Sequence, residues 1–241
     1  MKNIGLILSR ELSSYLRTPS GYVIAACLLL VNGLLFNARA VGTGAKYSSE
    51  VLQQFLIDAG GTTMIAAVIF SMRMLAEERA NGTRTLLFTS PVREAEIVLG
   101  KFLAALLFLS VITSLTIYLP ALIFIRGKVS IGHIGAGYLG MFLLGAATLS
   151  IGMFASALVK NPFLAVLLAA VFVTTFELAW WVGQITDPPF KTFVSYVAPY
   201  MKHFHPFRRG LVQLSDIVFY ATVIGVSLLA SVRVLQSQRW Q

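Results

Sequence analysis

The stretch "LAEERANGTRTLLFTSPVREAEIVLGKF" (residues 75–102) places eight charged residues between two long apolar runs. The whole chain of 241 residues is 57% hydrophobic and only 12% charged, with a mean hydropathy of +0.79. So few charged side chains cannot cover the surface of a soluble domain of this length. The sequence therefore predicts an all-α integral membrane protein, in which the charged stretch is a loop outside the bilayer.

Six apolar runs are long enough to span a bilayer, which takes about 20 residues of helix. An even number of spans puts both termini on one side, and residues 1–20 and 77–101 together hold seven lysines and arginines. Because basic residues near span ends favour the cytoplasmic side, we expect both termini in the cytoplasm. The predicted single transmembrane domain, residues 1–241, has spans at 22–38, 55–76, 97–125, 134–158, 163–183 and 217–235.

Residues 1–20 are predicted to form an amphipathic helix at the membrane interface. Leu6 and Glu11 do not fit the helical projection, and Pro19 and Gly21 are expected to end the helix before the first span. The alternative is a frayed, solvated terminus. The shared apolar face consists of Ile4, Ile7, Leu8, Leu12, Tyr15 and Leu16.

Several kinds of site are not supported by the sequence. A single cysteine, Cys27, excludes an intrachain disulfide, and His203 with His205 lacks an obvious third metal ligand. The motif G-x-x-x-x-G-K-[ST] is absent, so any ATP must be bound by another chain, and no enzyme activity is expected. The formal net charge of +9 is interpreted as topology signals and contacts with lipid headgroups rather than nucleic-acid binding.

Two features within the spans admit two interpretations each. Small residues recur along the fourth span at helical spacing, as at Gly140 and Gly152, which favours close packing either inside one chain or between two copies. Glu177, in the fifth span, is a candidate pathway residue, or it pairs with a basic group in the adjoining loop. Arg73 and Asp58 lie near span ends and are expected to extend toward the membrane surface.

Residues 184–216 connect the last two predicted spans. This connection is too long for a simple hairpin, and aromatic and aliphatic residues are interspersed among its charges. Irregular backbone at membrane depth is tolerated only where protein or water covers it. We therefore expect an outer loop that packs back against the membrane or re-enters it.

The charged loop, residues 77–96, has clear local signals. Asn81 and Gly82 form a turn, and Ser90 with Pro91 is typical of a helix N-terminus. The apolar triplet between them, residues 86–88, is flanked by charge and cannot enter lipid. It is either a docking element for a partner protein or part of an ordinary solvated loop.

Residues 77–108 resemble the pattern E-x-x-x-G-T-x-x-x-L-x-x-x-P-V-x-x-x-E-I-V-x-G-K of ABC-2 type permeases, the membrane subunits of type V ABC exporters. Residues 198–235 are similar to the gliding-motility-associated branch of that family, which has H-F-x-x-F-x-x-G before an aspartate and the last span. The resemblance covers nearly the whole chain in order.

The resemblance implies a permease that dimerises with itself or a paralogue and couples to a pair of ABC ATPase subunits, which hold ATP and Mg²⁺. The outer loop would form re-entrant hairpins containing His203, Phe204, Phe207, Gly210 and Asp216. Arg208 and Arg209 depart from what a purely lipidic substrate would favour. The ATPase-coupling residues would be Glu77, Glu78, Gly82, Thr83, Leu86, Leu87, Phe88, Pro91 and Arg93, with Lys160 and Asn161 as a second contact.

Three functions follow from these features. The first is the permease of an ATP-driven exporter, through which a substrate crosses the membrane when the ATPase hydrolyses ATP. The second keeps the ATPase but transmits force to an auxiliary membrane protein with an outer domain, for surface motility or envelope remodelling. The third is an ATP-independent channel or secondary carrier that uses Glu177.

Overall fold

The computed structural model describes residues 2–42, 46–80, 93–125, 127–185, 187 and 196–239, with the side chains of residues 2, 20 and 239 left aside. All regular structure in these ranges is helical. Short helices connect the long ones: η1 (Phe36–Val41), η2 (Ser71–Arg73), α4 (Ala76–Ala80), α7 (Tyr118–Ile123), η3 (Pro199–His203) and α11 (Phe204–Arg208). The long helices are α1 (Lys2–Arg17), α2 (Pro19–Leu35), α3 (Ser48–Phe70), α6 (Glu94–Leu115), α8 (Ile131–Leu158), α9 (Pro162–Ile185) and α12 (Leu214–Arg239).

Within the described part of the chain, six helical segments are long and apolar enough to cross a membrane, which confirms the predicted number of spans. They extend beyond the predicted runs at most ends; the second begins at Ser48 rather than at residue 55. Helices continue into polar flanks that hydropathy does not register, so most helical segments are longer than the predicted spans, whose bounds in the bilayer stay a prediction. The segments are Gly21–Val41, Ser48–Ala80, Glu94–Ile123, Ile131–Leu158, Pro162–Ile185 and Leu214–Gln238.

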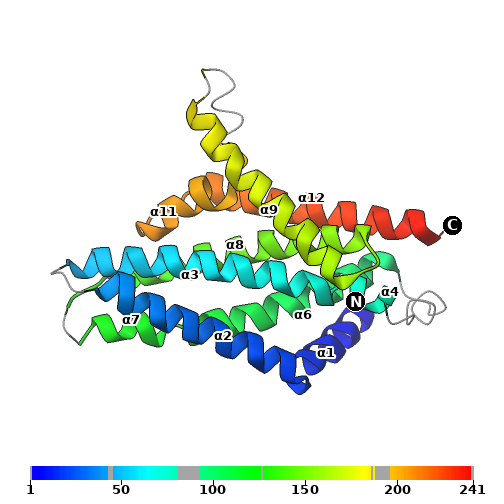
Figure 1. The fold of residues 1–241 in the computed structure, drawn as a ribbon, viewed down its shortest axis with the longest axis horizontal. Coiled ribbons are helices and arrows are strands. Elements are labelled where there is room, and N and C mark those ends of the chain that lie inside the picture. Colours follow the sequence, from blue (N-terminus) through cyan, green and yellow to red (C-terminus); the bar gives the residue numbers. More distant parts are fainter. Residues whose placement is uncertain are drawn as a thin grey trace.

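The long helices α2, α3, α6, α8 and α12 run lengthwise beside one another, while α9 crosses them obliquely (Figure 1). Both chain ends and α4 lie at one end of the bundle, on the right of Figure 1, which we call the α4 end. The helices α7 and α11 lie toward the opposite end, called the α11 end. An even number of crossings thus returns the chain to the end where it began.

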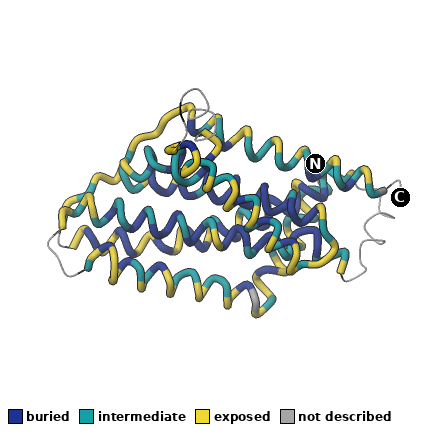
Figure 2. Tube along the Cα trace, turned by 45° about the horizontal axis from the view of Figure 1, so that its top comes forward, coloured by how far each residue is buried: buried dark blue, intermediate teal, exposed yellow. Residues whose placement is uncertain are grey.

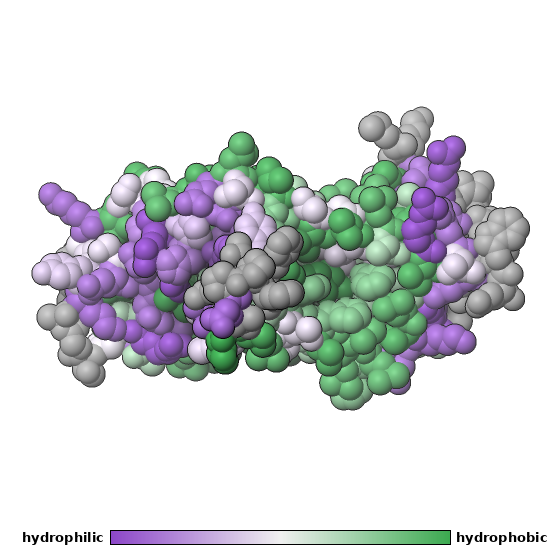
Figure 3. Space-filling view, turned by 90° about the horizontal axis from the view of Figure 1, so that it is seen from above, coloured by the Kyte–Doolittle hydropathy of each residue, from purple (hydrophilic) through white to green (hydrophobic). Residues whose placement is uncertain are grey.

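Helix α8 is the centre of the bundle. Its most apolar 18-residue window is 78% buried, compared with 17% for α9 and 11% for α12 (Figure 2). Met141, Leu144 and Leu149 of α8 are fully buried. The apolar outer sides of α9 and α12 stay uncovered by the rest of the chain, and Figure 3 shows them as a broad apolar band between two polar ends. This band is suited to lipid or to another membrane protein.

The small residues of α8 serve packing within the chain at three positions. A Cβ atom added at Gly140 would lie 2.5 Å from Cβ of Phe207, and one at Gly152 would lie 2.7 Å from Cβ of Ser71. The Ser156 hydroxyl oxygen accepts hydrogen bonds from the backbone N–H groups at the start of α4, at 2.9 and 3.0 Å. At these positions the intramolecular interpretation is therefore the correct one.

We predict that Gly140→Ala lowers the free energy of unfolding by about 1–3 kcal/mol through overpacking. The obstructing atom, Cβ of Phe207, is next to the backbone and cannot rotate away. Thermal unfolding in detergent measures the effect. Gly135→Ala on the same helix is the matched control, because an added Cβ there meets nothing within 4 Å. Equal melting temperatures for the two variants would contradict the packing assigned to Gly140.

Candidate functional site

A buried lysine at the α4 end joins three helices. Lys101 of α6 has a side chain only 4% exposed, and its Nζ lies 3.2 Å from Oε1 of Glu11 in α1 and 3.0 Å from Oε1 of Glu78 in α4. Arg10 lies 3.2 and 3.6 Å from the same two carboxylates. We call these residues, Arg10, Glu11, Glu78 and Lys101, the charged junction. Cations and carboxylates alternate in it, so each charge has an opposite neighbour.

Helix α1 packs closely on α6 beside the charged junction. A Cβ atom at Gly100 would lie 2.7 Å from Cγ2 of Ile7, so glycine permits the approach. Further along α1, Tyr15 is buried between Phe70 and Phe108, with ring centroids 5.7 and 5.2 Å away. Burial, and then the charge of Glu11, raise the pKa of Tyr15 above its ordinary value, so the phenol is neutral.

Further polar contacts hold α4 to the rest of the α4 end. Arg79 donates hydrogen bonds to the carbonyl oxygen of Val159, at 3.3 Å, and to Oε1 of Gln238 in α12, at 2.5 Å. Gln238 donates in turn to the carbonyl oxygen of Ala157 at the end of α8. The short helix α4, which contains the first residues of the charged loop, is therefore attached to α1, α6, α12 and the α8–α9 turn.

At the α11 end, a buried histidine joins the chain before α12 to α12 itself. We call residues 196–213, which fold back onto the bundle, the folded-back segment. Nδ1 of His203 lies 2.7 Å from Oδ1 of Asp216, and Nε2 lies 2.8 Å from the carbonyl oxygen of Tyr196. The imidazole stacks on Phe219 with centroids 3.7 Å apart. Both ring nitrogens therefore lie within hydrogen-bond distance of an oxygen acceptor, and the imidazole is held between Asp216 and the backbone of Tyr196.

Two phenylalanines seat the folded-back segment on the bundle. Phe204 and Phe207 are 1% and 0% exposed and pack against the glycines of α3 and α8, Gly60 and Gly140. The Tyr200 hydroxyl donates to the carbonyl oxygen of Ile57 at 2.7 Å, and burial raises its pKa to about 12, which keeps it a donor. The segment is thus fixed by side-chain packing rather than by regular helix alone.

The segment closes in a turn at Gly210. Its φ of +80° lies in the left-handed region, which favours glycine, and the imidazole of His133 lies 3.1 Å from the place a Cβ would occupy. Nε2 of His133 donates to the carbonyl oxygen of Arg208 at 2.8 Å. The start of α8 therefore holds the end of the folded-back segment.

Glu177 of α9 holds the start of η3. Its Oε1 accepts a hydrogen bond from the backbone N–H of Tyr200 at 2.8 Å, and its Oε2 accepts one from that of Met201 at 3.2 Å. These N–H groups belong to the first turn of the helix and have no partner within it. Glu177 is therefore bound to the adjoining segment through backbone groups, and among the described residues it pairs with no basic side chain.

Comparison with known families agrees with this architecture. The sequence model described as ABC-2 family transporter protein matches residues 16–232, which is most of the chain. The chain belongs to the ABC-2 transporter family. It is a permease component of an ABC transporter, a multi-pass membrane protein of a family that associates with an ABC ATPase. No curated protein matches the chain significantly.

In this ABC-2 permease the predicted coupling residues are only partly described. Glu77 and Glu78 lie in α4, and Arg93 precedes α6, where its backbone N–H donates to Oε2 of Glu96. Lys160 and Asn161 are exposed in the α8–α9 turn, next to the carbonyl that Arg79 binds. The helix start expected at Ser90 lies outside the described residues. The remaining predicted coupling residues also lie outside them: Gly82, Thr83, Leu86, Leu87, Phe88 and Pro91.

The structure brings the five predicted outer-loop residues of the permease into one packed unit: His203, Phe204, Phe207, Gly210 and Asp216. It corrects two expectations for span ends. Asp58 is buried and lies 2.6 Å from Nη1 of Arg39, and Arg73 lies over the Tyr15 ring and 3.5 Å from Glu77. Both therefore pair within the protein rather than extend to the membrane surface. Gly21 also lies inside α2, where it contacts the carbonyl oxygen of Tyr15.

Sequence reasoning missed the charged junction. In the sequence, Lys101 counts only among the basic residues that indicate topology, and Glu11 is only an exception in the projection of residues 1–20. A carboxylate on the apolar face of a helix that also bears Tyr15 was the available signal, because such a group needs a buried cation. Among the described residues, no group of three His, Cys, Asp or Glu side chains could hold a metal ion.

We predict that Glu177→Gln loosens the start of η3. The amide keeps one acceptor oxygen and turns an NH₂ group toward a backbone N–H, which costs about 1–3 kcal/mol locally. Hydrogen exchange at the amides of Tyr200 and Met201 should quicken, whereas Thr175→Val on the same helix should leave it unchanged. If Glu177→Gln instead abolishes ATP-independent flux and leaves hydrogen exchange at these two amides unchanged, the channel or carrier interpretation is supported.

Proposed function

We propose that this permease couples ATP hydrolysis by a separate pair of ABC ATPase subunits to export across the bacterial inner membrane. The α4 end would face the cytoplasm, and residues 83–88 of the charged loop would dock on the ATPase. ATP and Mg²⁺ would be bound by the ATPase, not by this chain. The observation that supports this proposal is the charged junction, whose Glu78 lies in α4, a few residues before the docking residues in the sequence.

The junction suits transmission of force. A displacement of the loop pulls on α4, and α4 cannot move alone without separating Glu78 from Lys101 and Arg79 from Gln238. Separating a buried cation from its carboxylates is costly, because the surroundings screen the charges poorly. A movement imposed by the ATPase would therefore reach α1, α6, α8 and α12 together.

The α11 end of the permease would move together with the same helices. The folded-back segment is held on α3 and α8 through Phe204 and Phe207 and on α12 through Asp216. We expect it to form the re-entrant outer element and α1 to lie along the cytoplasmic interface. The permease would act as a dimer with itself or a paralogue, with the gliding-motility branch as its expected relatives.

Docking is tested by affinity purification of the permease and assay of the co-purifying ATPase. Leu86→Asp combined with Leu87→Asp is expected to abolish co-purification, because charged side chains cannot enter an apolar groove of a partner. Ser237→Asp adds a charge at an exposed position of the α4 end outside the loop and should leave co-purification intact. Retention of the ATPase by the double variant would rule out docking through this triplet.

A further inference from the structure

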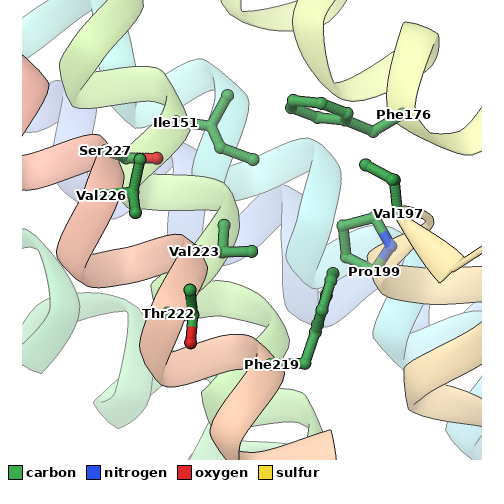
Figure 4. A pocket seen from close by; sticks show the side chains of 9 residues that line it. All are labelled: Ile151, Phe176, Val197, Pro199, Phe219, Thr222, Val223, Val226 and Ser227. Carbon is green, nitrogen blue, oxygen red and sulfur yellow. The ribbon is translucent and has the colours of Figure 1, made fainter. Parts of the chain in front are cut away.

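An apolar groove runs along α12, beneath the oblique helix α9. A cavity of about 220 Å³ has Ile151 of α8 at its base, with Phe176 and Val223 among its walls (Figure 4). A second cavity of about 430 Å³ continues toward the α11 end and is lined by Tyr196 and Leu214. Both cavities share Phe219 and Thr222, so we treat them as one feature, the α12 groove.

The lining of the α12 groove suits a hydrocarbon chain. No charged side chain lines either cavity among the described residues. The Thr222 hydroxyl donates to the carbonyl oxygen of Val218 in its own helix, so its hydrogen is already bonded within the protein. At its rim Val226 is 62% exposed and Leu214 is 76% exposed, so the groove opens onto the apolar band of Figure 3. An occupant can therefore enter sideways from the bilayer.

The length of the groove matches one lipid leaflet. Its lining extends along α12 from Leu214 to Ser227, which is about 20 Å at the rise of an α-helix. One leaflet of hydrocarbon is about 15 Å deep. An extended acyl chain lying along α12 would fill the groove from its deep end and bring its headgroup to the α11 end.

The ammonium group of Lys202 lies at the α11 end of the groove. Nζ of Lys202 lies 4.3 Å from the centre of the Tyr196 ring, which lines the outer cavity. Within the described ranges, no carboxylate lies within ion-pair distance of Lys202. The ammonium group is thus placed where a lipid phosphate would lie and is available to pair with it.

We propose that the α12 groove binds one membrane phospholipid, with an acyl chain between α8, α9 and α12 and its phosphate at Lys202. This binding is independent of the coupling function proposed above. A second apolar cavity, about 350 Å³ between α2 and α3, is lined by Cys27 and Ile65 among others, with no cation in its lining. It should accept acyl chains without selecting a headgroup, and it serves as an internal control.

Photolabelling in proteoliposomes tests the proposal. The probes are phosphatidylglycerol and diacylglycerol that carry the same diazirine-bearing acyl chain, and labelled peptides are counted by mass spectrometry. Phosphatidylglycerol should label residues 214–227 about fivefold more than diacylglycerol, which corresponds to about 1 kcal/mol for one lysine–phosphate contact. The α2–α3 cavity should be labelled equally by both probes.

Variants assign the labelling to the groove. Lys202→Gln should abolish the preference for phosphatidylglycerol, and Lys202→Arg should retain it. Val223→Trp should remove labelling of residues 214–227, and Val226→Trp at the exposed rim is a second way to fill the groove. Unchanged labelling of the α2–α3 cavity shows in each case that the variant is folded.

Two results would overturn the proposal. Equal labelling of the α12 groove by both probes would show ordinary bulk lipid without a headgroup site. Absence of labelling, together with a disulfide between copies in Thr222→Cys on a Cys27→Ser background, would show that a second copy of the chain covers the groove.

Discussion

Lys101→Met is expected to lower the free energy of unfolding of the permease by about 3–5 kcal/mol, the usual cost of removing one partner from a buried charge cluster. Methionine matches the length of the lysine stem but leaves Glu11 and Glu78 facing each other without their shared cation. Arg10 is 67% exposed and compensates only in part. Thermal unfolding in detergent, with hydrogen exchange of α1, measures the loss.

The design includes a matched control and a rescue. Lys160→Met removes an exposed lysine at the same end and should change stability by less than about 0.5 kcal/mol. Adding Glu11→Gln and Glu78→Gln to Lys101→Met removes the two carboxylates that Lys101 contacts and should recover part of the stability. If Lys101→Met behaves like Lys160→Met, the charged junction does not hold α1 and α4 on α6.

Asp216→Ala is expected to destabilise the α11 end by a similar amount, about 3–5 kcal/mol. It leaves the imidazole of His203, only 1% exposed, without the carboxylate that its Nδ1 faces. Stacking on Phe219 remains but does not replace the contact with Asp216. Hydrogen exchange across residues 196–210 should quicken far more than exchange in α6, because the folded-back segment loses its link to α12.

A conservative substitution at Asp216 and a control substitution at another aspartate show how much of the loss comes from the buried pair. Asp216→Asn keeps an acceptor oxygen for Nδ1 of His203 and should cost less than alanine. The second carboxylate oxygen, Oδ2, is buried and accepts no hydrogen bond from the described residues, so an amide there loses no hydrogen bond, but its NH₂ group is buried and part of the cost remains. Asp187→Ala, at an exposed aspartate near the same end, is the control. Equal effects of the alanine substitutions at 187 and 216 would exclude a role for the buried pair.

Hydropathy predicted the spans well because each apolar run has to meet lipid or another apolar run, whatever its neighbours are. It does not predict where the helices themselves begin and end, as at Ser48 and Arg239, since a helix continues beyond the apolar residues that reveal it. The motif around His203 and Phe207 indicated that these residues act together, and the structure shows the packing that joins them. The roles of Gly60 and Gly152 depended on which side chains lie opposite, and spacing alone does not reveal that.

The sequence by itself determined that this protein is a six-span ABC-2 permease with a charged loop after the second span. These features depend on local composition and on short contiguous motifs. Only the tertiary structure decided that Lys101 pairs with Glu11 and Glu78, and that Glu177 binds the backbone of η3. The physical reason is that a charge in an apolar chain requires a partner, but the partner comes from whichever helix packs alongside.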